Sequence, residues 1–230
     1  MIKININFEK IVELSHPMIP GEEKFNLQID VRDVTDYLPH IIHRPDVWYV
    51  LTDIELNSHM GTHIEFPFHH LQEGASAGEY PLESLIGNAV VIDVSHRKAD
   101  EYITVEDVMK YEEDVKEGYI IFIRTGFDKL FRKENWNDEI HMSQEAMDWL
   151  LTKKPIVIGT DATGFEIPDT DNGPIHITMF KQNVAMIESC CNLDKIQGKN
   201  ALVFILPLPI KGLDSCPVRM IAMLDGSIEQ

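Results

Sequence analysis

Six apolar runs rich in β-branched residues recur along this 230-residue chain, and they restrict the possible fold more than any other feature. Each run is a near-continuous series of Val, Ile and Leu, which is typical of strands covered on both faces of a sheet. The runs lie at residues 11–16, 48–56, 89–95, 119–126, 155–161 and 201–208. The sequence therefore predicts a mostly buried β core.

Helix signals lie between some of these runs. Residues 104–115 begin with Thr104 as a cap and an acidic first turn, which predicts a helix. Residues 143–153 open on Ser143 and stop before Pro155, and they are rich in good helix formers. Both helices are expected to flank the sheet in an α/β fold.

No repeat, linker or low-complexity stretch divides the chain, so residues 1–230 are expected to form a single mixed domain. Two long irregular connections, 60–88 and 162–180, are where functional residues are expected.

The net charge of −18 comes from 38 acidic and 20 basic residues. Such a surface repels phosphate and anionic lipid, so nucleic acids and membranes are poor candidate partners. No run approaches the roughly 20 apolar residues that a bilayer requires, and the N-terminus lacks the apolar region of a signal peptide. A cytoplasmic protein is expected.

The three cysteines form neither a disulfide framework nor a thiolate metal site, and Cys190, Cys191 and Cys216 are expected in the core.

Four of the ten histidines lie within NSHMGTHIEFPFHH, residues 57–70. His59 and His63 have helical spacing, but Gly61 and Pro67 disfavour a helix. In an extended chain, alternate side chains project to one face, so His59, His63 and Glu65 would converge and Gly61 would leave room for an ion. Two imidazoles and a carboxylate are a common ligand set for a metal site that keeps a coordination position open. The alternative is that these histidines are loop residues or core residues with satisfied hydrogen bonds. It explains less well why three ligand-type residues share one face between Gly61 and Pro67.

Downstream, His176 and Glu188 are twelve residues apart, which is not a general metal signature. By themselves they are interpreted as an exposed loop histidine and a surface glutamate.

The stretch HMGTHIEFPFHH, residues 59–70, resembles the signature HxGxHxDxPxH of the cyclase family of metal-dependent hydrolases. The resemblance runs nearly end to end, through segments at residues 13–25, 120–126, 156–166 and 216–223. It implies a fold of the swivelling β/β/α type with flanking helices.

Several roles follow from the resemblance alone. It implies that His59, His63 and Glu65 are metal ligands, that His69 carries the catalytic proton, and that His176 and Glu188 hold a second ion. Ligands without thiolate favour zinc or manganese. The family has Asp where this chain has Glu65, which leaves open whether one or two ions bind. His70 stands where the family usually has an aromatic residue, so a packing or pocket-edge role is expected.

The implied function is hydrolysis of a small amide or formamide, as by an arylformamidase. One alternative is a hydrolase or cyclase acting on a cyclic imide, lactam or lactone. Another is a non-catalytic metal-binding protein. The family also implies a homodimer or a higher homo-oligomer, with the N-terminal segment as one contact, and a small-molecule substrate.

Other side chains near the motif are less informative. Trp48, Tyr49, Phe66 and Phe68 are interpreted as core residues rather than pocket walls. Arg124 fits either a structural ion pair or a substrate carboxylate.

Overall fold

A nine-stranded mixed sheet organises the structure, a computed structural model that describes residues 5–44, 46–136, 140–168, 170 and 173–229. Its strand order is β13-β5-β11-β10-β8-β6-β12-β14-β2. The strands are β2 (Ile11–Glu13), β5 (His63–Glu65), β6 (Ile86–Asp93), β8 (Ile120–Arg124), β10 (Val157–Thr160), β11 (Ala185–Glu188), β12 (Ala201–Leu206), β13 (Ser215–Pro217) and β14 (Arg219–Leu224). The central strands β6, β8, β10 and β11 run parallel, and the strands on either side of them pair antiparallel.

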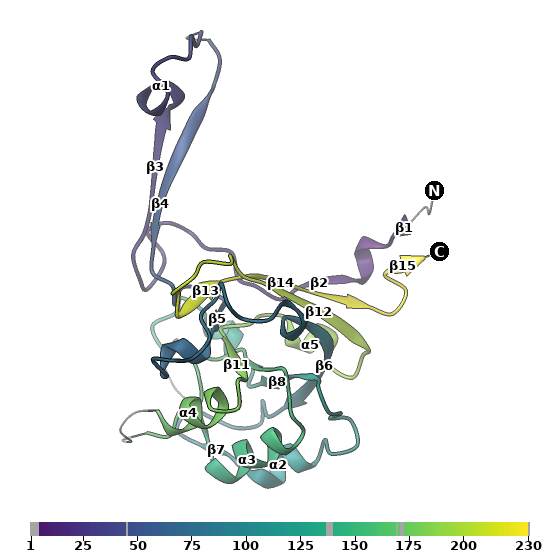
Figure 1. Ribbon diagram of the computed structural model, residues 1–230. Helices are drawn as coiled ribbons and strands as arrows, with labels where there is room; N and C mark the ends of the chain where they lie inside the picture. The colour runs from purple at the N-terminus through teal and green to yellow at the C-terminus, as the bar shows by residue number, and fades with distance from the viewer. Residues whose placement is uncertain (1–4, 45, 137–139, 169, 171–172, 230) are drawn as a thin grey trace.

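The part of the chain that the structure describes also contains three small sheets, each made of two strands. They pair β1 (Asn5–Ile6) with β15 (Ile228–Glu229), β3 (Leu27–Asp33) with β4 (Val50–Leu56), and β7 (Tyr102–Ile103) with β9 (His141–Met142). The β3–β4 ribbon projects away from the body of the molecule and carries α1 near its tip (Figure 1). Residues 1–4 of the expected N-terminal contact lie outside the described residues.

The helices are short. They are α1 (Val34–Tyr37), α2 (Val105–Met109), α3 (Gln144–Thr152), α4 (Pro174–Phe180) and α5 (Leu193–Ile196). Both predicted caps are confirmed: Thr104 opens α2 with a capping box, and the Ser143 hydroxyl accepts from the Ala146 N–H at the start of α3. The predicted helix 104–115 is too long. Three carboxylates at residues 112–114 would face the negative end of its dipole, and the chain continues there in turns. In the part of the chain described here, no helix is both long and apolar enough to cross a membrane.

The core lies on both faces of the sheet, as predicted for its central strands. In β8, Ile120 and Phe122 pack into one apolar cluster, while Ile121 and Ile123 pack into another. Helices α2, α3 and α4 contribute to the second cluster and lie together on one side of the sheet (Figure 1). The curled outer strands and α5 cover the first cluster.

The sequence predicts that β12 and β4 are covered on both faces, and in both strands this is wrong. In β12 the buried residues Ala201, Val203 and Ile205 alternate with more exposed neighbours. Most of β4 is exposed because, within the described residues, it pairs with β3 alone, outside the main sheet. An apolar run identifies a strand, but it does not say what covers the strand.

Candidate metal centre

The histidine motif folds around β5, which supplies His63 and Glu65, and the following 3-10 helix Pro67–His69 supplies His69. The expected extended chain from His59 to Glu65 is wrong, because His59 lies in a bend before β5 and Gly61 has φ +58°. This left-handed turn, which glycine adopts readily, still brings the side chains together. The His59 Nδ1 atom lies 2.8 Å from Glu65 Oε1, and His63 Nε2 lies 3.6 Å from the same oxygen.

His63 is oriented by the turn that precedes it. Its Nδ1–H donates to the carbonyl oxygen of Gly61 at 2.9 Å, so the lone pair is on Nε2. Among the described residues, the buried atoms His63 Nε2 and Glu65 Oε2 have no hydrogen-bond partner. Buried polar atoms without a partner are costly, and a coordinated cation would satisfy both of them. The donor set therefore fits a divalent ion.

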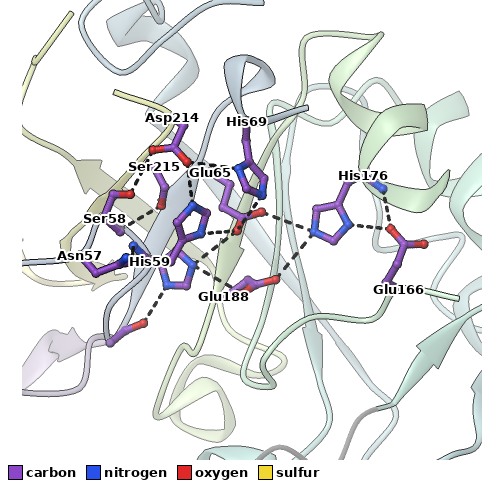
Figure 2. Close-up of polar contacts among 12 residues, drawn as sticks. Asn57, Ser58, His59, Glu65, His69, Glu166, His176, Glu188, Asp214 and Ser215 are labelled. Atoms are coloured by element: carbon purple, nitrogen blue, oxygen red, sulfur yellow. Dashed lines mark hydrogen bonds and ion pairs between the residues drawn. The ribbon is translucent and has the colours of Figure 1, made fainter. Parts of the chain in front are cut away.

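A second group lies on the other side of Glu65. His176 comes from α4 and Glu188 ends β11, whose pairing with β5 places Glu188 opposite His63. The His176 Nε2 atom lies 3.4 Å from Glu65 Oε2 and 3.8 Å from Glu188 Oε1 (Figure 2). The interpretation of these two residues as exposed loop and surface groups is wrong. The strand pairing that brings them to Glu65 is not visible in the local sequence.

The ligand-type atoms thus form two groups that share Glu65: His59, His63 and Glu65, and Glu65, His176 and Glu188. Within each group the candidate ligand atoms lie within 4.8 Å of one another. Beside them, His69 lies with its Nε2 atom 3.9 Å from Glu65 Oε1 and its Nδ1 atom 3.2 Å from Asp214 Oδ2. His69 borders one cavity of about 610 Å³ together with His59 and His63 of the first group and Glu188 of the second. Phe25, Phe131 and Trp136 also line this cavity.

The family model named Cyclase, described as "Putative cyclase", matches residues 12–167. The chain belongs to the cyclase family. Kynurenine formamidase from Salinibacter ruber is 25% identical over 172 residues, 74% of this chain and 78% of that protein. Isatin hydrolase from Roseibium aggregatum is 28% identical over 196 residues, 74% of this chain and 73% of that protein. An isatin hydrolase structure with thioisatinate bound superposes with a TM-score of 0.77 at 20% identity, covering 93% and 91% of the two chains. The predicted family and the mixed α/β fold are confirmed.

Electrostatics in this cyclase-family centre favour a positive charge between the carboxylates. Burial opposes ionisation of Glu65, but the nearby imidazoles of His176, His59 and His63 outweigh it and hold the Glu65 pKa well below its usual value. Burial and the charge of Glu65 raise the pKa of Glu188. Burial lowers the pKa of His59, yet Glu65 and Asp214 raise it overall to about 9. The carboxylates thus hold positive charge on the imidazoles, and a divalent cation would supply the same compensation.

His69 differs from the other imidazoles. Burial lowers its pKa, and the attraction of Glu65 does not fully reverse the effect. His69 is therefore neutral near pH 7 and able to accept a proton.

The sequence did not reveal three polar partners of the centre. The Asp214 carboxylate contacts both His59 and His69, and Ser58 donates to its other oxygen. Glu166 Oε2 lies 2.7 Å from His176 Nδ1. Asp214 lies far along the chain, in the connection between β12 and β13, and nothing in its neighbourhood marks it as a partner of the motif.

Other side chains that the sequence singles out differ in burial and in role. His70 has the expected packing role, because its ring stacks on His176 with centroids 5.1 Å apart. Arg124 forms a structural ion pair with Asp93 at 2.8 Å. Phe66 is in the core, whereas the core interpretation of Trp48 and Tyr49 is wrong because both are exposed in the connection that leads into β4. The three cysteines are buried and unbridged, as predicted.

Proposed function

We propose that residues 1–230 act as one metal-dependent hydrolase domain that cleaves a small amide or formamide, as an arylformamidase does. The observation that carries the proposal is the pair of ligand groups that share Glu65, with His69 beside them on the same cavity. Relatives named kynurenine formamidase and isatin hydrolase support the choice of reaction.

The metal ligands in this proposal are His59, His63 and Glu65 for one ion, and Glu65, His176 and Glu188 for a second. Glu65 directs Oε1 to the first group and Oε2 to the second, which supports two ions despite the replacement of the family's Asp. Nitrogen and oxygen ligands favour zinc or manganese. When bound, the metal supplies a water that ionises near pH 7 and a Lewis acid for the substrate carbonyl.

The chain's own residues would complete the reaction. His69 accepts a proton at Nε2 and returns it to the departing nitrogen, because Nδ1 faces Asp214 and Nε2 faces the centre. Phe131 and Trp136 line the cavity and pack edge to face, with centroids 5.1 Å apart. These aromatic side chains give the cavity an apolar wall that suits an aryl substrate.

The decisive experiment compares wild type with His69→Ala after loading with Zn²⁺ or Mn²⁺. We expect formylkynurenine turnover by wild type and a loss of about 10²- to 10⁴-fold in kcat for His69→Ala, the usual contribution of general acid–base catalysis. Metal content, measured by atomic emission, should stay unchanged. Loss of metal from His69→Ala would contradict the assigned role.

A second candidate reaction is the opening of a cyclic imide, lactam or lactone, favoured by the 28% identity to an isatin hydrolase. Isatin, cyclic imides and aryl lactones therefore belong in the same assay. Metal uptake with no turnover of any of these compounds would favour a non-catalytic metal-binding protein.

We also propose that the protein is a cytoplasmic homodimer or higher homo-oligomer. The three unbridged cysteines support a reducing compartment. The β3–β4 ribbon supports self-association, because Leu27, Ile29 and Val31 share one face with Ile54 and Leu56. On this face Ile29 and Ile54 are 48% and 61% exposed. A two-stranded ribbon is marginal alone, and a second copy would cover its apolar face.

A further inference from the structure

The side chain of Asp214 joins the two functional parts of the centre. Its Oδ2 atom lies 2.8 Å from His59 Nε2 and 3.2 Å from His69 Nδ1, and its Oδ1 atom accepts from the Ser58 hydroxyl at 3.0 Å (Figure 2). The backbone of Asp214 is held in place as well, because the N–H of Phe66 donates to the Asp214 carbonyl at 2.9 Å. One carboxylate thus contacts an imidazole of the first ligand group and the neighbouring His69.

We propose that Asp214 is a positioning residue that orients His59 for metal binding and His69 for proton transfer. This role rests on the function proposed above. A neutral imidazole has one N–H and one lone pair. His59 must be neutral to bind a metal. With its N–H then held at Nε2 by Asp214, the lone pair lies at Nδ1, the atom that faces Glu65. A carboxylate on the outer nitrogen of a ligand histidine commonly fixes its tautomer and increases its basicity.

Asp214 fixes the tautomer of His69 in the same way. Its Nδ1–H donates to Asp214, which leaves the lone pair on Nε2, the atom on the side of Glu65. Without the carboxylate, the His69 ring would be free to rotate and to adopt the other tautomer. Sharing Asp214 also keeps the two rings close together, with centroids 4.5 Å apart.

A direct role as a ligand is the main competing interpretation. The ligand-type atoms of His59, His69 and Asp214 lie within 4.8 Å of one another, so these three side chains could surround an ion themselves. That arrangement would withdraw His59 Nε2 from its bond to Asp214. The number of bound ions separates the two interpretations, because removal of a positioning residue weakens binding without removing a site.

The test uses Asp214→Asn, which preserves size but removes the charge and one acceptor oxygen. Mn²⁺ binding is measured by chelator competition and by calorimetry, which give affinity and stoichiometry without any substrate. We expect the wild-type number of ions and an affinity about 10- to 100-fold weaker for one of them, the usual effect of losing an outer partner. Asp225→Asn is the matched control, because Asp225 bonds to Asn200 on an exposed surface outside the centre.

A double-mutant cycle tests the effect on His69. At saturating Mn²⁺, Asp214→Asn introduced alone should lower kcat on formylkynurenine by at least tenfold. The same substitution introduced into His69→Ala should lower kcat little further. Additive losses in kcat, or an Mn²⁺ affinity equal to that of Asp225→Asn, would overturn the proposal. Loss of one ion would show that Asp214 is a ligand instead. If wild type binds Mn²⁺ but has no turnover, the proposed function fails, while the affinity comparison still tests the effect on His59.

Glu166 provides an internal comparison within the same protein. It contacts His176 Nδ1 as Asp214 contacts His59 Nε2, but it belongs to the second ligand group. Glu166→Gln should therefore weaken the binding of one ion of the pair, and Asp214→Asn should weaken the binding of the other. Weakening of the same ion by both substitutions would contradict the assignment of Asp214 to His59.

Discussion

At the scale of single residues, Glu65 is the shared member of both ligand groups. Glu65→Gln keeps the length of the side chain but removes the charge that both groups share. We expect the affinity for both ions to fall by more than the roughly 10- to 100-fold that the loss of an outer partner costs. Glu188→Gln is the matched control and should weaken only one ion. Metal titration followed by atomic emission measures the affinities of both variants. An unchanged affinity for either ion in Glu65→Gln would contradict the bridging role.

Gly164 gives Glu188 room to approach the centre. A Cβ atom at this position would lie 2.8 Å from Glu188 Oε1, and the backbone has φ +135°. Gly164→Ala should therefore displace the carboxylate and weaken one ion, in addition to a strain of about 1–3 kcal/mol. Gly118→Ala is a suitable control, because Gly118 also has a positive φ but no atom near its missing Cβ. Equal Mn²⁺ affinities in the two variants, measured by calorimetry, would refute the effect on Glu188.

Local spacing was sufficient to predict that His59, His63 and Glu65 converge, because all three lie within seven residues. It gave the wrong backbone, since the left-handed turn at Gly61 replaces the extended chain. It could not find Asp214, whose partner His59 is 155 positions away. His176 and Glu188 were recovered only through the family resemblance, since strand pairing and helix placement bring them to Glu65.

At the scale of elements, the buried Asp107 anchors the start of α2. Its carboxylate accepts from the Thr104 N–H at 3.1 Å, from Arg97 at 2.7 Å and from Lys110 at 3.2 Å. Burial raises the Asp107 pKa, but these bonds outweigh it and lower the value to about 2. Since the folded pKa is below the unfolded one, the stabilisation is complete above about pH 4 and disappears as the pH falls toward 2.

Asp107→Asn should therefore reduce the free energy of unfolding at pH 7 by about 1.5–3 kcal/mol, the range for hydrogen bonds to charged groups. The difference from wild type should become smaller as the pH falls below about 4. Urea unfolding across this pH range measures the effect. A deficit that is constant with pH would show that the charge of Asp107 contributes nothing.

Caps are predictable because they depend on a few neighbouring residues, as Thr104 and Ser143 illustrate. The placement of β4 was not predictable, since its apolar pattern resembles that of a core strand. Strand pairing decides where β4 lies. Within the described residues it pairs with β3 alone, and the ribbon projects from the body of the molecule (Figure 1). Burial of a strand is a property of its neighbours, which a local pattern does not contain.

At the scale of the whole molecule, the β3–β4 ribbon has two unlike faces. The pairing Ile29↔Ile54 belongs to the apolar face, whereas Gln28↔Glu55 and Asp30↔Asp53 belong to the polar face. An isolated ribbon of this kind lacks a core of its own. Its apolar face is therefore the surface that we expect a second copy of the chain to cover.

Substitution of Ile54 by lysine tests this assembly. Wild type should be a dimer or a larger oligomer in size-exclusion chromatography with light scattering. Ile54→Lys should raise the dissociation constant at least about tenfold, equivalent to 1.4 kcal/mol, because the ammonium group would lose water in the contact. Gln28→Lys adds the same charge to the polar face and should leave association unchanged. A monomeric wild type at micromolar concentration would exclude this face as the contact. Equal effects of the two lysines would exclude it as well, because a contact through the apolar face is disturbed by Ile54→Lys and not by Gln28→Lys.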